Sequence, residues 1–256
     1  MKCVAIIPAR YQSSRFEGKP LAKICGKPMI QRVCENVIKA RGIAEVAVAT
    51  DDSRIAAAVE AFGAKVVMTG EKNRSGTDRV AEAARNMDLS DSDVVVNVQG
   101  DQPLIHPDCL DEVVAPFSKD PDVVMTTLAF KIVREEEITN PKDVKVVCDK
   151  SGFALYFSRS PVPFGRDPEA AFDIYKHLGV YAYTKKFLDI FANLPDGRLE
   201  NIEKLEQLRA LEHGYKIKVA VTEHDSPEVD LPEDIALVEE ILNESREQGT
   251  TLYWRE

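Results

Sequence analysis

The fold is decided by the stretch Val4-Ala5-Ile6-Ile7-Pro8-Ala9-Arg10-Tyr11-Gln12-Ser13-Ser14-Arg15-Phe16-Glu17-Gly18-Lys19-Pro20 near the start of the chain. Its first four residues form an apolar run that predicts a buried β-strand. Pro8 ends this strand because proline has no N–H to donate to a sheet. A small and polar loop with Arg10, Arg15 and Lys19 comes next, and residues 28–38 then have helical spacing. The stretch therefore predicts a cationic loop between a first strand and a helix.

The position of this loop predicts that it binds an anion. In open α/β sheets, ligands bind beyond the carboxyl ends of the strands. Backbone N–H groups there, together with Arg and Lys, can hold a triphosphate, although an ordinary basic surface loop would look similar. The loop matches neither G-x-x-x-x-G-K-[ST] nor G-x-G-x-x-G, because Gly18-Lys19 is followed by Pro20 and Gly26-Lys27 by Pro28. A P-loop NTPase and a nicotinamide dehydrogenase are both disfavoured.

Composition bounds the class of protein. The 256 residues suffice for one large α/β domain, and a net charge of −10 disfavours a nucleic-acid-binding protein. Five cysteines without C-x-x-C spacing are typical of reduced thiols rather than of disulfides or a zinc site. No run approaches the roughly 18 apolar residues of a membrane span, and the first residues lack a signal-peptide pattern. We expect a cytoplasmic protein with neither nucleic-acid nor membrane partners.

Strand and helix patterns alternate along the first half of the chain. Such alternation is typical of a doubly wound, mostly parallel sheet with right-handed crossovers, so the fold class is α/β. After the first strand and helix, the predicted strands are 45–50, 65–68, 93–98 and 123–130, and the predicted helices are 54–62, 75–87 and 107–117.

Residues 131–183 have shorter, more β-like patterns. The turn 149–152 joins two of their apolar runs as a hairpin. We expect a single domain, 1–256, in which 131–183 is an antiparallel β-rich insertion that closes one side of the pocket. Beyond it, helical patterns cover 185–192, 200–212 and 231–247, and 217–221 has the pattern of a strand.

Two aspartates and one helix start lie at positions suited to binding. Asp101 follows the most strand-like run, where a carboxylate commonly holds Mg²⁺ against a nucleotide phosphate; a turn aspartate is the alternative. Asp230 precedes the last helix, where an N-cap is the alternative. Ser75 to Asp78 fit an ordinary capping box, and the free N–H groups of that helix would face the same end of the sheet as the first loop.

Taken in this order, the segments resemble the 3-deoxy-manno-octulosonate (Kdo) cytidylyltransferases, also called CMP-Kdo synthetases. The resemblance runs from the first strand to the last helix, and it implies a nucleotide-diphospho-sugar transferase-like fold. The matching stretches are Ile7-Pro8-Ala9-Arg10-Tyr11, Ser14-Arg15, Gly18-Lys19-Pro20-Leu21, Ala49-Thr50-Asp51, Ser75-Gly76-Thr77-Asp78-Arg79, Asn97-Val98-Gln99-Gly100-Asp101, Ala154-Leu155-Tyr156-Phe157-Ser158-Arg159, His177-Leu178-Gly179-Val180-Tyr181, Leu205-Glu206-Gln207-Leu208-Arg209, Val229-Asp230 and Pro232-Glu233-Asp234.

The resemblance implies a nucleotidyltransferase that joins CTP and Kdo to give CMP-Kdo and pyrophosphate, for lipopolysaccharide biosynthesis. The C2 hydroxyl of the sugar acid would attack the α-phosphorus of CTP, with two Mg²⁺ ions as cofactors. A triphosphate and a sugar carboxylate repel each other, so catalysis needs alignment and charge neutralisation. The resemblance also implies a homodimer in which residues 131–183 pair across a two-fold axis.

The resemblance implies a role for each candidate residue. The catalytic residues are Arg10, Lys19, Asp101 and Asp230, of which Asp101 and Asp230 bind the metal. The nucleotide site consists of Pro8, Ala9, Arg10, Arg15, Lys19, Ser75, Gln99 and Gly100. The sugar acid is held by Arg79, Arg159, His177, Tyr181, Glu206 and Gln207, although His177 could instead be a packed core histidine.

Two departures leave the sugar open. Family members usually carry Gly-Asp-Glu-Pro where this chain has Gln102 after Asp101, and Ser-Gly-Thr-Glu-Arg where it has Asp78 before Arg79. The reaction class survives, but the sugar could be Kdo, its 8-amino-3,8-dideoxy form or a nonulosonic acid. A sugar-1-phosphate nucleotidyltransferase and a non-catalytic nucleotide-binding protein compete with this interpretation. Retention of Asp101 and Asp230 argues against a protein that only binds nucleotide.

Overall fold

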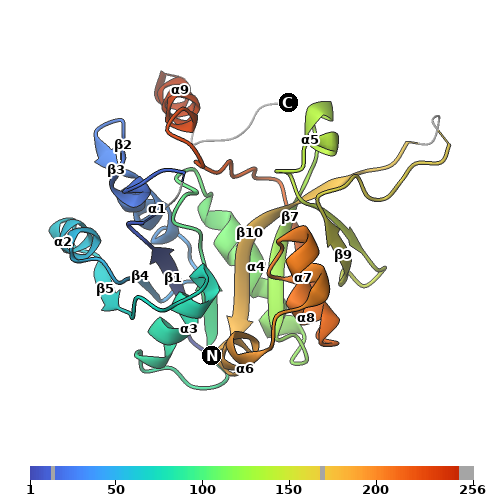
Figure 1. The fold of residues 1–256 in the computed structure, drawn as a ribbon, viewed down its shortest axis with the longest axis horizontal. Coiled ribbons are helices and arrows are strands. Elements are labelled where there is room, and N and C mark those ends of the chain that lie inside the picture. The colour runs from blue at the N-terminus through green and yellow to red at the C-terminus, as the bar shows by residue number, and fades with distance from the viewer. Residues whose placement is uncertain (13–14, 168–170, 248–256) are drawn as a thin grey trace.

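The computed structural model describes residues 1–12, 15–167 and 171–247, so Ser13 and Ser14 of the first loop lie outside the described residues. Within that part of the chain, strands form one nine-stranded sheet and one small two-stranded sheet. Helices cover both faces of the large sheet (Figure 1).

The large sheet is doubly wound and mostly parallel, as predicted. Its main path runs β11-β7-β10-β6-β1-β4-β5. β1 pairs in parallel with β4 and β6, β4 with β5, and β7 with β11, whereas β10 is antiparallel to β6 and β7. The bounds are β1 Cys3–Ala9, β4 Glu45–Thr50, β5 Lys65–Met68, β6 Val94–Asn97, β7 Met125–Lys131, β10 Tyr175–Thr184 and β11 Lys218–Thr222.

The packing of strand β1 on both of its faces explains why its sequence is apolar without alternation. Its Ala5 and Ile7 pack into one core with residues of α1 and α4, while Val4 and Ile6 pack into a second core with residues of α3 and α6. Successive side chains of a strand point to opposite faces, and both faces of a doubly wound sheet are covered. A continuous apolar run is therefore the expected pattern for this central strand.

Helices form at the predicted positions apart from 200–212, and side chains cap several of them, including α2 and α3. Asp52 accepts a hydrogen bond from the Arg54 amide at 2.9 Å at the start of α2, and Ser75 accepts one from the Asp78 amide at 3.1 Å at the start of α3. Such bonds satisfy backbone donors that have no partner inside the helix. The bounds are α1 Met29–Val37, α2 Ser53–Ala61, α3 Gly76–Arg85, α4 Pro107–Lys119, α5 Glu135–Thr139, α6 Lys185–Asn193 and α9 Asp234–Glu247, with a short 3₁₀ helix η1 Lys19–Leu21 and the two-stranded sheet β2 Lys23–Ile24 and β3 Lys27–Pro28.

The predicted hairpin is present, formed by β8 Lys145–Cys148 and β9 Ala154–Ser158. β8 pairs with the first residues of β10. β10 itself continues into the central sheet, where it lies between β6 and β7. The insertion predicted for residues 131–183 includes this strand. Residues 159–167 and 171–174 extend as an arm away from the body of the molecule (Figure 1).

The single helix predicted for 200–212 is wrong. Two short helices occupy this region, α7 Arg198–Glu203 and α8 Leu208–Glu212. Lys204 ends α7 with φ of 55°, a left-handed conformation that interrupts helical hydrogen bonding. Amphipathic spacing does not reveal such a residue. The interruption leaves Glu206 and Gln207 in the connection between the two helices.

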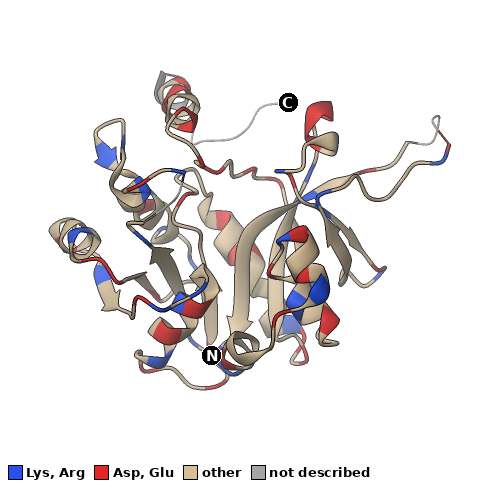
Figure 2. Ribbon diagram, viewed as in Figure 1, with Lys and Arg blue, Asp and Glu red and all other residues tan. Residues whose placement is uncertain are grey.

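The carboxyl ends of the parallel strands lie at the end of the sheet near α5 and α9 (Figure 1). Acidic positions are prominent on both of these helices (Figure 2). None of the helices in the described part of the chain combines the length and the apolar character needed to cross a membrane.

Candidate active site

The carboxyl ends of β1 and β6 meet at the point where the strand order reverses, which is where ligands bind in such sheets. A Cβ added to Gly100 would lie 3.0 Å from the carbonyl oxygen of Pro8, and one added to Gly76 would lie 3.4 Å from the Pro8 ring. Glycine at position 100 therefore lets the loop after β6 approach the end of β1. The structure thus brings together Pro8 and Gly100, both predicted for the nucleotide site.

Lys19 connects the two predicted metal-binding aspartates. Its Nζ donates to Asp101 Oδ2 at 2.6 Å and to the Val229 carbonyl at 3.0 Å, and it lies 3.8 Å from Asp230 Oδ1. Arg15 adds a 3.1 Å contact from Nη1 to Asp230 Oδ2. The side chain of Lys19 is 16% exposed and those of both aspartates are 23% exposed, so a ligand can reach them. Three segments far apart in the sequence meet here, and they bring together the predicted residues Arg15, Lys19, Asp101 and Asp230.

These two aspartates fit a divalent cation. Both carboxylates lie around one ammonium group, which shows that they converge on a single position of positive charge. Mg²⁺ prefers one or two carboxylates with water and phosphate oxygens as its remaining ligands. Asp101 and Asp230 supply that donor set.

Arg10 joins the first loop to the segment before α3. Its Nη2 donates to the carbonyls of Asn73 and Ser75, each at 2.6 Å. Burial, followed by the charge of Arg79, lowers the pKa of the Arg10 guanidinium. Two cations near each other in a partly buried place favour an anion. This supports the predicted phosphate contact of Arg10.

Glu206 links the nucleotide residues to the sugar residues. Its carboxylate accepts hydrogen bonds from Ser75 Oγ at 3.0 Å and Thr77 Oγ1 at 2.9 Å. Burial raises the pKa of Glu206, and these two hydrogen bonds oppose the shift. The neighbouring Gln207 is 3% exposed, and its Nε2 has no hydrogen-bond partner in the described part of the chain. A buried amide donor of this kind is suited to a ligand oxygen.

His177 and Tyr181 lie beside each other on β10, with ring centroids 5.2 Å apart. His177 Nε2 is 2.9 Å from Thr127 Oγ1, and burial lowers the pKa of His177 to about 3. The imidazole is therefore neutral near pH 7 and can act as a hydrogen-bonding group but not as a cation. Gln99, predicted for the nucleotide site, donates from Nε2 to the Gly179 carbonyl at 3.0 Å and so meets this strand.

The two arginines predicted for the sugar carboxylate have other partners. Arg79 is fully buried, and it donates to Asp51 Oδ2 at 2.9 Å and to Thr69 Oγ1 at 2.6 Å. Arg159 donates to the carbonyls of Glu203 and Pro141, both at 2.7 Å. The structure does not bring Arg79 together with the residues around Lys19, and the sugar role of both arginines stays a prediction.

Glu228 is a candidate that the sequence analysis missed. Gln102, the residue that departs from the family pattern, donates from Nε2 to Glu228 Oε1 at 3.3 Å. Burial, followed by the charges of Asp101 and Asp230, raises the pKa of Glu228 to about 7. Side chains two residues apart in an extended segment point to the same side. The spacing of Glu228 and Asp230 was therefore the signal that could have revealed it.

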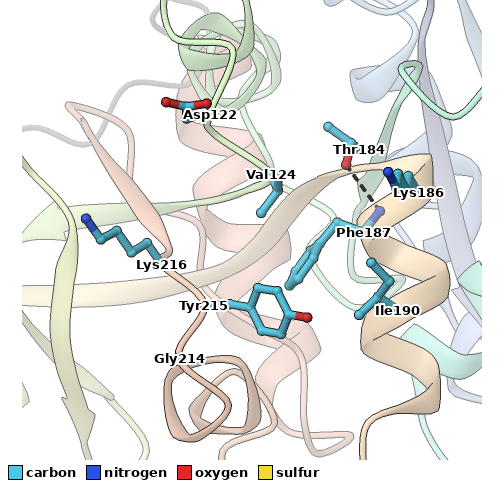
Figure 3. A pocket seen from close by; sticks show the side chains of 9 residues that line it. All are labelled: Asp122, Val124, Thr184, Lys186, Phe187, Ile190, Gly214, Tyr215 and Lys216. Carbon is cyan, nitrogen blue, oxygen red and sulfur yellow. Dashed lines mark hydrogen bonds between the residues drawn. The ribbon is translucent and has the colours of Figure 1, made fainter.

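A pocket of about 430 Å³ lies at the opposite end of the sheet, and none of the predicted site residues lines it. Figure 3 shows Phe187 and Tyr215 at its centre, with ring centroids 4.8 Å apart. Lys216 and Lys186 lie on opposite sides of these two rings in the same view (Figure 3). The pocket has no set of converging polar groups like that around Lys19, so we place the active site at the carboxyl ends of the strands.

Comparisons with known proteins agree with this geometry. Residues 4–217 match the cytidylyltransferase family. A 3-deoxy-manno-octulosonate cytidylyltransferase of Desulfosudis oleivorans is 62% identical over 94% of this chain and 98% of its own length. An 8-amino-3,8-dideoxy-manno-octulosonate cytidylyltransferase of Shewanella piezotolerans is 57% identical over 93% and 98%. A solved structure of CMP:2-keto-3-deoxy-manno-octonic acid synthetase in complex with CTP superposes with a TM-score of 0.90 at 41% identity, covering 96% of this chain and all of that one.

Proposed function

This chain belongs to the cytidylyltransferase family, and we propose that it joins CTP and Kdo to give CMP-Kdo and pyrophosphate. The observation that carries the proposal is the meeting of Lys19, Asp101 and Asp230 at the carboxyl end of β6. A cytidylyl transfer requires that a triphosphate be aligned and its charge neutralised beside a second anionic substrate. A lysine and two carboxylates within reach of a ligand meet that requirement.

The first loop holds the phosphates in this proposal. Arg10, Arg15 and Lys19 are cations whose partners are carbonyl or carboxylate oxygens. Phosphate oxygens can replace those partners, and Arg binds them in a bidentate, charge-assisted manner. Lys19 would leave Asp101 for the triphosphate, and the freed carboxylate would then accept a metal ion.

Asp101 and Asp230 would hold Mg²⁺, which when bound neutralises phosphate charge and makes the attacking C2 hydroxyl of the sugar more acidic. The backbone fixes the positions of the two carboxylates. Asp101 follows β6, and the Val229 amide donates to the Asp101 carbonyl at 2.9 Å. That backbone bond keeps the segment of Asp230 beside the segment of Asp101.

The sugar acid lies against Glu206, Gln207, His177 and Tyr181 in this proposal. Glu206 accepts hydrogen bonds from sugar hydroxyls, and Gln207 Nε2 donates to one of its oxygens. Neutral His177 positions a hydroxyl without adding charge. Arg159 binds the carboxylate after exchanging one of its carbonyl partners. Arg79, which is fully buried, supports the site through Asp51 and Thr69.

The 8-amino form of the sugar is the second candidate. Gln102 replaces the usual glutamate of the family, and a carboxylate is instead supplied by Glu228 at 3.3 Å from it. A carboxylate moved in this way would change how the site discriminates an ammonium group from a hydroxyl.

We also propose a homodimer that acts in the cytoplasm. Among the described residues of 131–183, four large apolar side chains are exposed, and a partner subunit would cover them. The most exposed of them is Phe164, at 86%. Closed two-fold assemblies are the commonest oligomers. The exposed apolar residues are Val133, Leu155, Phe164 and Phe172.

Light scattering should give twice the chain mass, and a monomer mass independent of concentration would contradict the dimer.

Release of pyrophosphate from CTP tests the function directly. The sugar panel consists of Kdo, 8-amino-Kdo, a sialic acid and sugar 1-phosphates, each with Mg²⁺. We expect turnover with Kdo or its 8-amino form and none with the sugar 1-phosphates. Turnover with a sugar 1-phosphate alone would overturn the proposal. A higher kcat/KM for 8-amino-Kdo than for Kdo would decide for the second candidate.

A further inference from the structure

Two histidines and an aspartate form a cluster outside the proposed active site. His106 caps the start of α4, Asp108 lies in the first turn of that helix, and His224 follows β11. The two imidazole rings stack with centroids 3.8 Å apart. Asp108 Oδ2 lies 3.6 Å from both His106 Nδ1 and His224 Nε2. One carboxylate oxygen therefore faces a nitrogen of each ring.

The spacing is close to that of a metal site. Ligand atoms bound to tetrahedral Zn²⁺ at about 2.0–2.1 Å lie roughly 3.3 Å from one another. The two nitrogen–oxygen distances exceed this value by a few tenths of an ångström, and one ligand atom from each of the three residues lies within 4.8 Å of the others. The Asp108 amide now donates to His106 Nδ1 at 3.2 Å, so metal binding would exchange this hydrogen bond and turn the rings slightly.

Glu112 provides a second, independent observation. It lies one helical turn beyond Asp108, on the same face of α4. Its Oε2 is buried without a hydrogen-bond partner in the described part of the chain. Burial raises the pKa of this carboxyl group, whereas Thr222 and the nearby His224 oppose the shift. A carboxylate oxygen in this situation is satisfied when a cation binds beside it.

We propose that His106, Asp108 and His224, with the charge of Glu112 beside them, bind a transition-metal ion of the Zn²⁺ class. Imidazole ligands select Zn²⁺, Co²⁺ or Ni²⁺ over Mg²⁺, which prefers oxygen ligands. This ion is therefore different in chemistry and place from the Mg²⁺ of Asp101 and Asp230.

The metal would connect the two segments that carry the active-site carboxylates. His106 lies five residues after Asp101, and His224 lies six residues before Asp230. A bond from each histidine to one ion joins these segments at a second point, in addition to the Val229–Asp101 backbone hydrogen bond. The ion contacts no substrate in this arrangement, so its role is to stabilise the position of the segments.

Titration of the metal-free full chain with Zn²⁺ by calorimetry, and with Co²⁺ by visible absorption, tests this site. We expect one equivalent bound per chain and d–d bands of a four-coordinate nitrogen–oxygen site. His224→Asn and His106→Gln should each weaken binding by at least about tenfold, since loss of even an outer partner of a ligand costs 10–100-fold. His213→Asn is the matched control, because His213 lies outside the cluster and contacts the Pro195 carbonyl.

Asp101→Asn separates this site from the proposed Mg²⁺ site. Zn²⁺ affinity should be unchanged in that variant, and saturating Mg²⁺ should not displace Co²⁺. Circular dichroism checks that each variant is folded, and the Co²⁺ spectrum of the unaltered chain needs no variant at all. The proposal is overturned if the unaltered chain shows no saturable Co²⁺ or Zn²⁺ binding, or if His224→Asn binds the metal as tightly as the unaltered chain. It is also overturned if His213→Asn or Asp101→Asn weakens metal binding as much as the cluster variants do.

Discussion

The two halves of the proposed active site hold their polar groups in different ways. In the nucleotide half, Lys19 and Arg15 form ion pairs with Asp101 and Asp230, and all four side chains are at least partly exposed. In the sugar half, Gln207 is buried and the neutral His177 has a hydroxyl as its partner. The nucleotide half is charged and reachable, whereas the sugar half combines these two uncharged groups with the buried carboxyl group of Glu206 and with Arg159.

This difference indicates how each half meets its substrate. Ion pairs near solvent are weak, so their members can exchange partners when a triphosphate and a divalent cation arrive. Buried polar groups are costly unless they are hydrogen-bonded, so the sugar half must be arranged before the sugar binds. The nucleotide half is therefore expected to rearrange, whereas the buried groups of the sugar half, unlike Arg159, are expected to stay as they are.

The largest effect is expected from Asp101→Asn, which removes charge and not volume. Metal-ion stabilisation contributes several kcal/mol to a transition state, so kcat should fall by roughly 10²–10³-fold or more. Pyrophosphate release at saturating CTP, sugar and Mg²⁺ measures the change, and circular dichroism verifies the fold. Near-normal turnover in saturating Mg²⁺ would contradict the assignment of Asp101.

Asp122→Asn is the control for that variant. Asp122 is exposed and lines the pocket at the opposite end of the sheet. The Asp122→Asn variant loses the same charge as Asp101→Asn, and its kcat should be unchanged. A similar loss in both variants would mean that net charge, and not the place of the carboxylate, matters.

Lys19→Gln tests whether the ion pair is exchangeable. A hydrogen bond to a charged group contributes about 1.5–3 kcal/mol, so kcat/KM for CTP should fall about 10- to 150-fold. Without the competing ammonium, Asp101 and Asp230 should bind Mn²⁺ more tightly in the absence of CTP. Electron paramagnetic resonance of Mn²⁺ measures this. Unchanged Mn²⁺ affinity in the variant would show that Lys19 does not compete for the carboxylates.

Arg159→Lys and Arg79→Lys compare an exchangeable contact with a buried one in the sugar half. For Arg159→Lys we expect kcat/KM for the sugar acid to fall about tenfold, because lysine cannot reproduce the planar contact of arginine. For Arg79→Lys we expect mainly lost stability, since its partners Asp51 and Thr69 are then incompletely satisfied. Steady-state kinetics with each substrate varied, together with urea unfolding, distinguish the two.

The outcome also decides the division of the site. If Arg159→Lys weakens CTP and leaves the sugar acid unaffected, this arginine belongs to the nucleotide half. If Arg79→Lys keeps full stability but loses affinity for the sugar, Arg79 reaches the substrate, as its family position implies.

The nucleotide half was the more predictable from sequence, for a physical reason. The apolar run of β1 and the strand before Asp101 are local patterns, and parallel strands necessarily bring their carboxyl ends together. The sequence therefore placed Lys19 near Asp101 without knowledge of any contact. Asp230 was recognised only through the family resemblance, because its local sequence alone favoured an N-cap.

The sugar half depends on contacts that no local pattern encodes. A left-handed Lys204 splits the predicted helix at 200–212 and places Glu206 and Gln207 between two short helices. The partner of Glu228, Gln102, is 126 residues away in sequence. Pairs of this kind follow from packing, which hydrophobic periodicity does not report.

The smallest effect concerns His177 and pH. Burial lowers the pKa of His177 to about 3, whereas an unfolded histidine titrates near 6.5. Below pH 6.5 the unfolded chain therefore binds a proton that the folded chain does not, so stability falls as pH falls from about 6.5 toward 3. One such group contributes at most about 1.4 kcal/mol per pH unit. Above pH 6.5 the group is neutral in both states and contributes no slope.

Urea unfolding of the unaltered chain and of His177→Gln at several pH values between 5 and 8 measures this contribution. The variant keeps a hydrogen-bonding side chain opposite Thr127 but cannot titrate, so its stability should fall less steeply below pH 6.5 than that of the unaltered chain. Above pH 6.5 the two profiles should run parallel. Nitrogen NMR of the imidazole gives the pKa directly. A titration of His177 near 6.5 would mean that the ring is hydrated, and the sugar half would then resemble the nucleotide half in being open to water and charge.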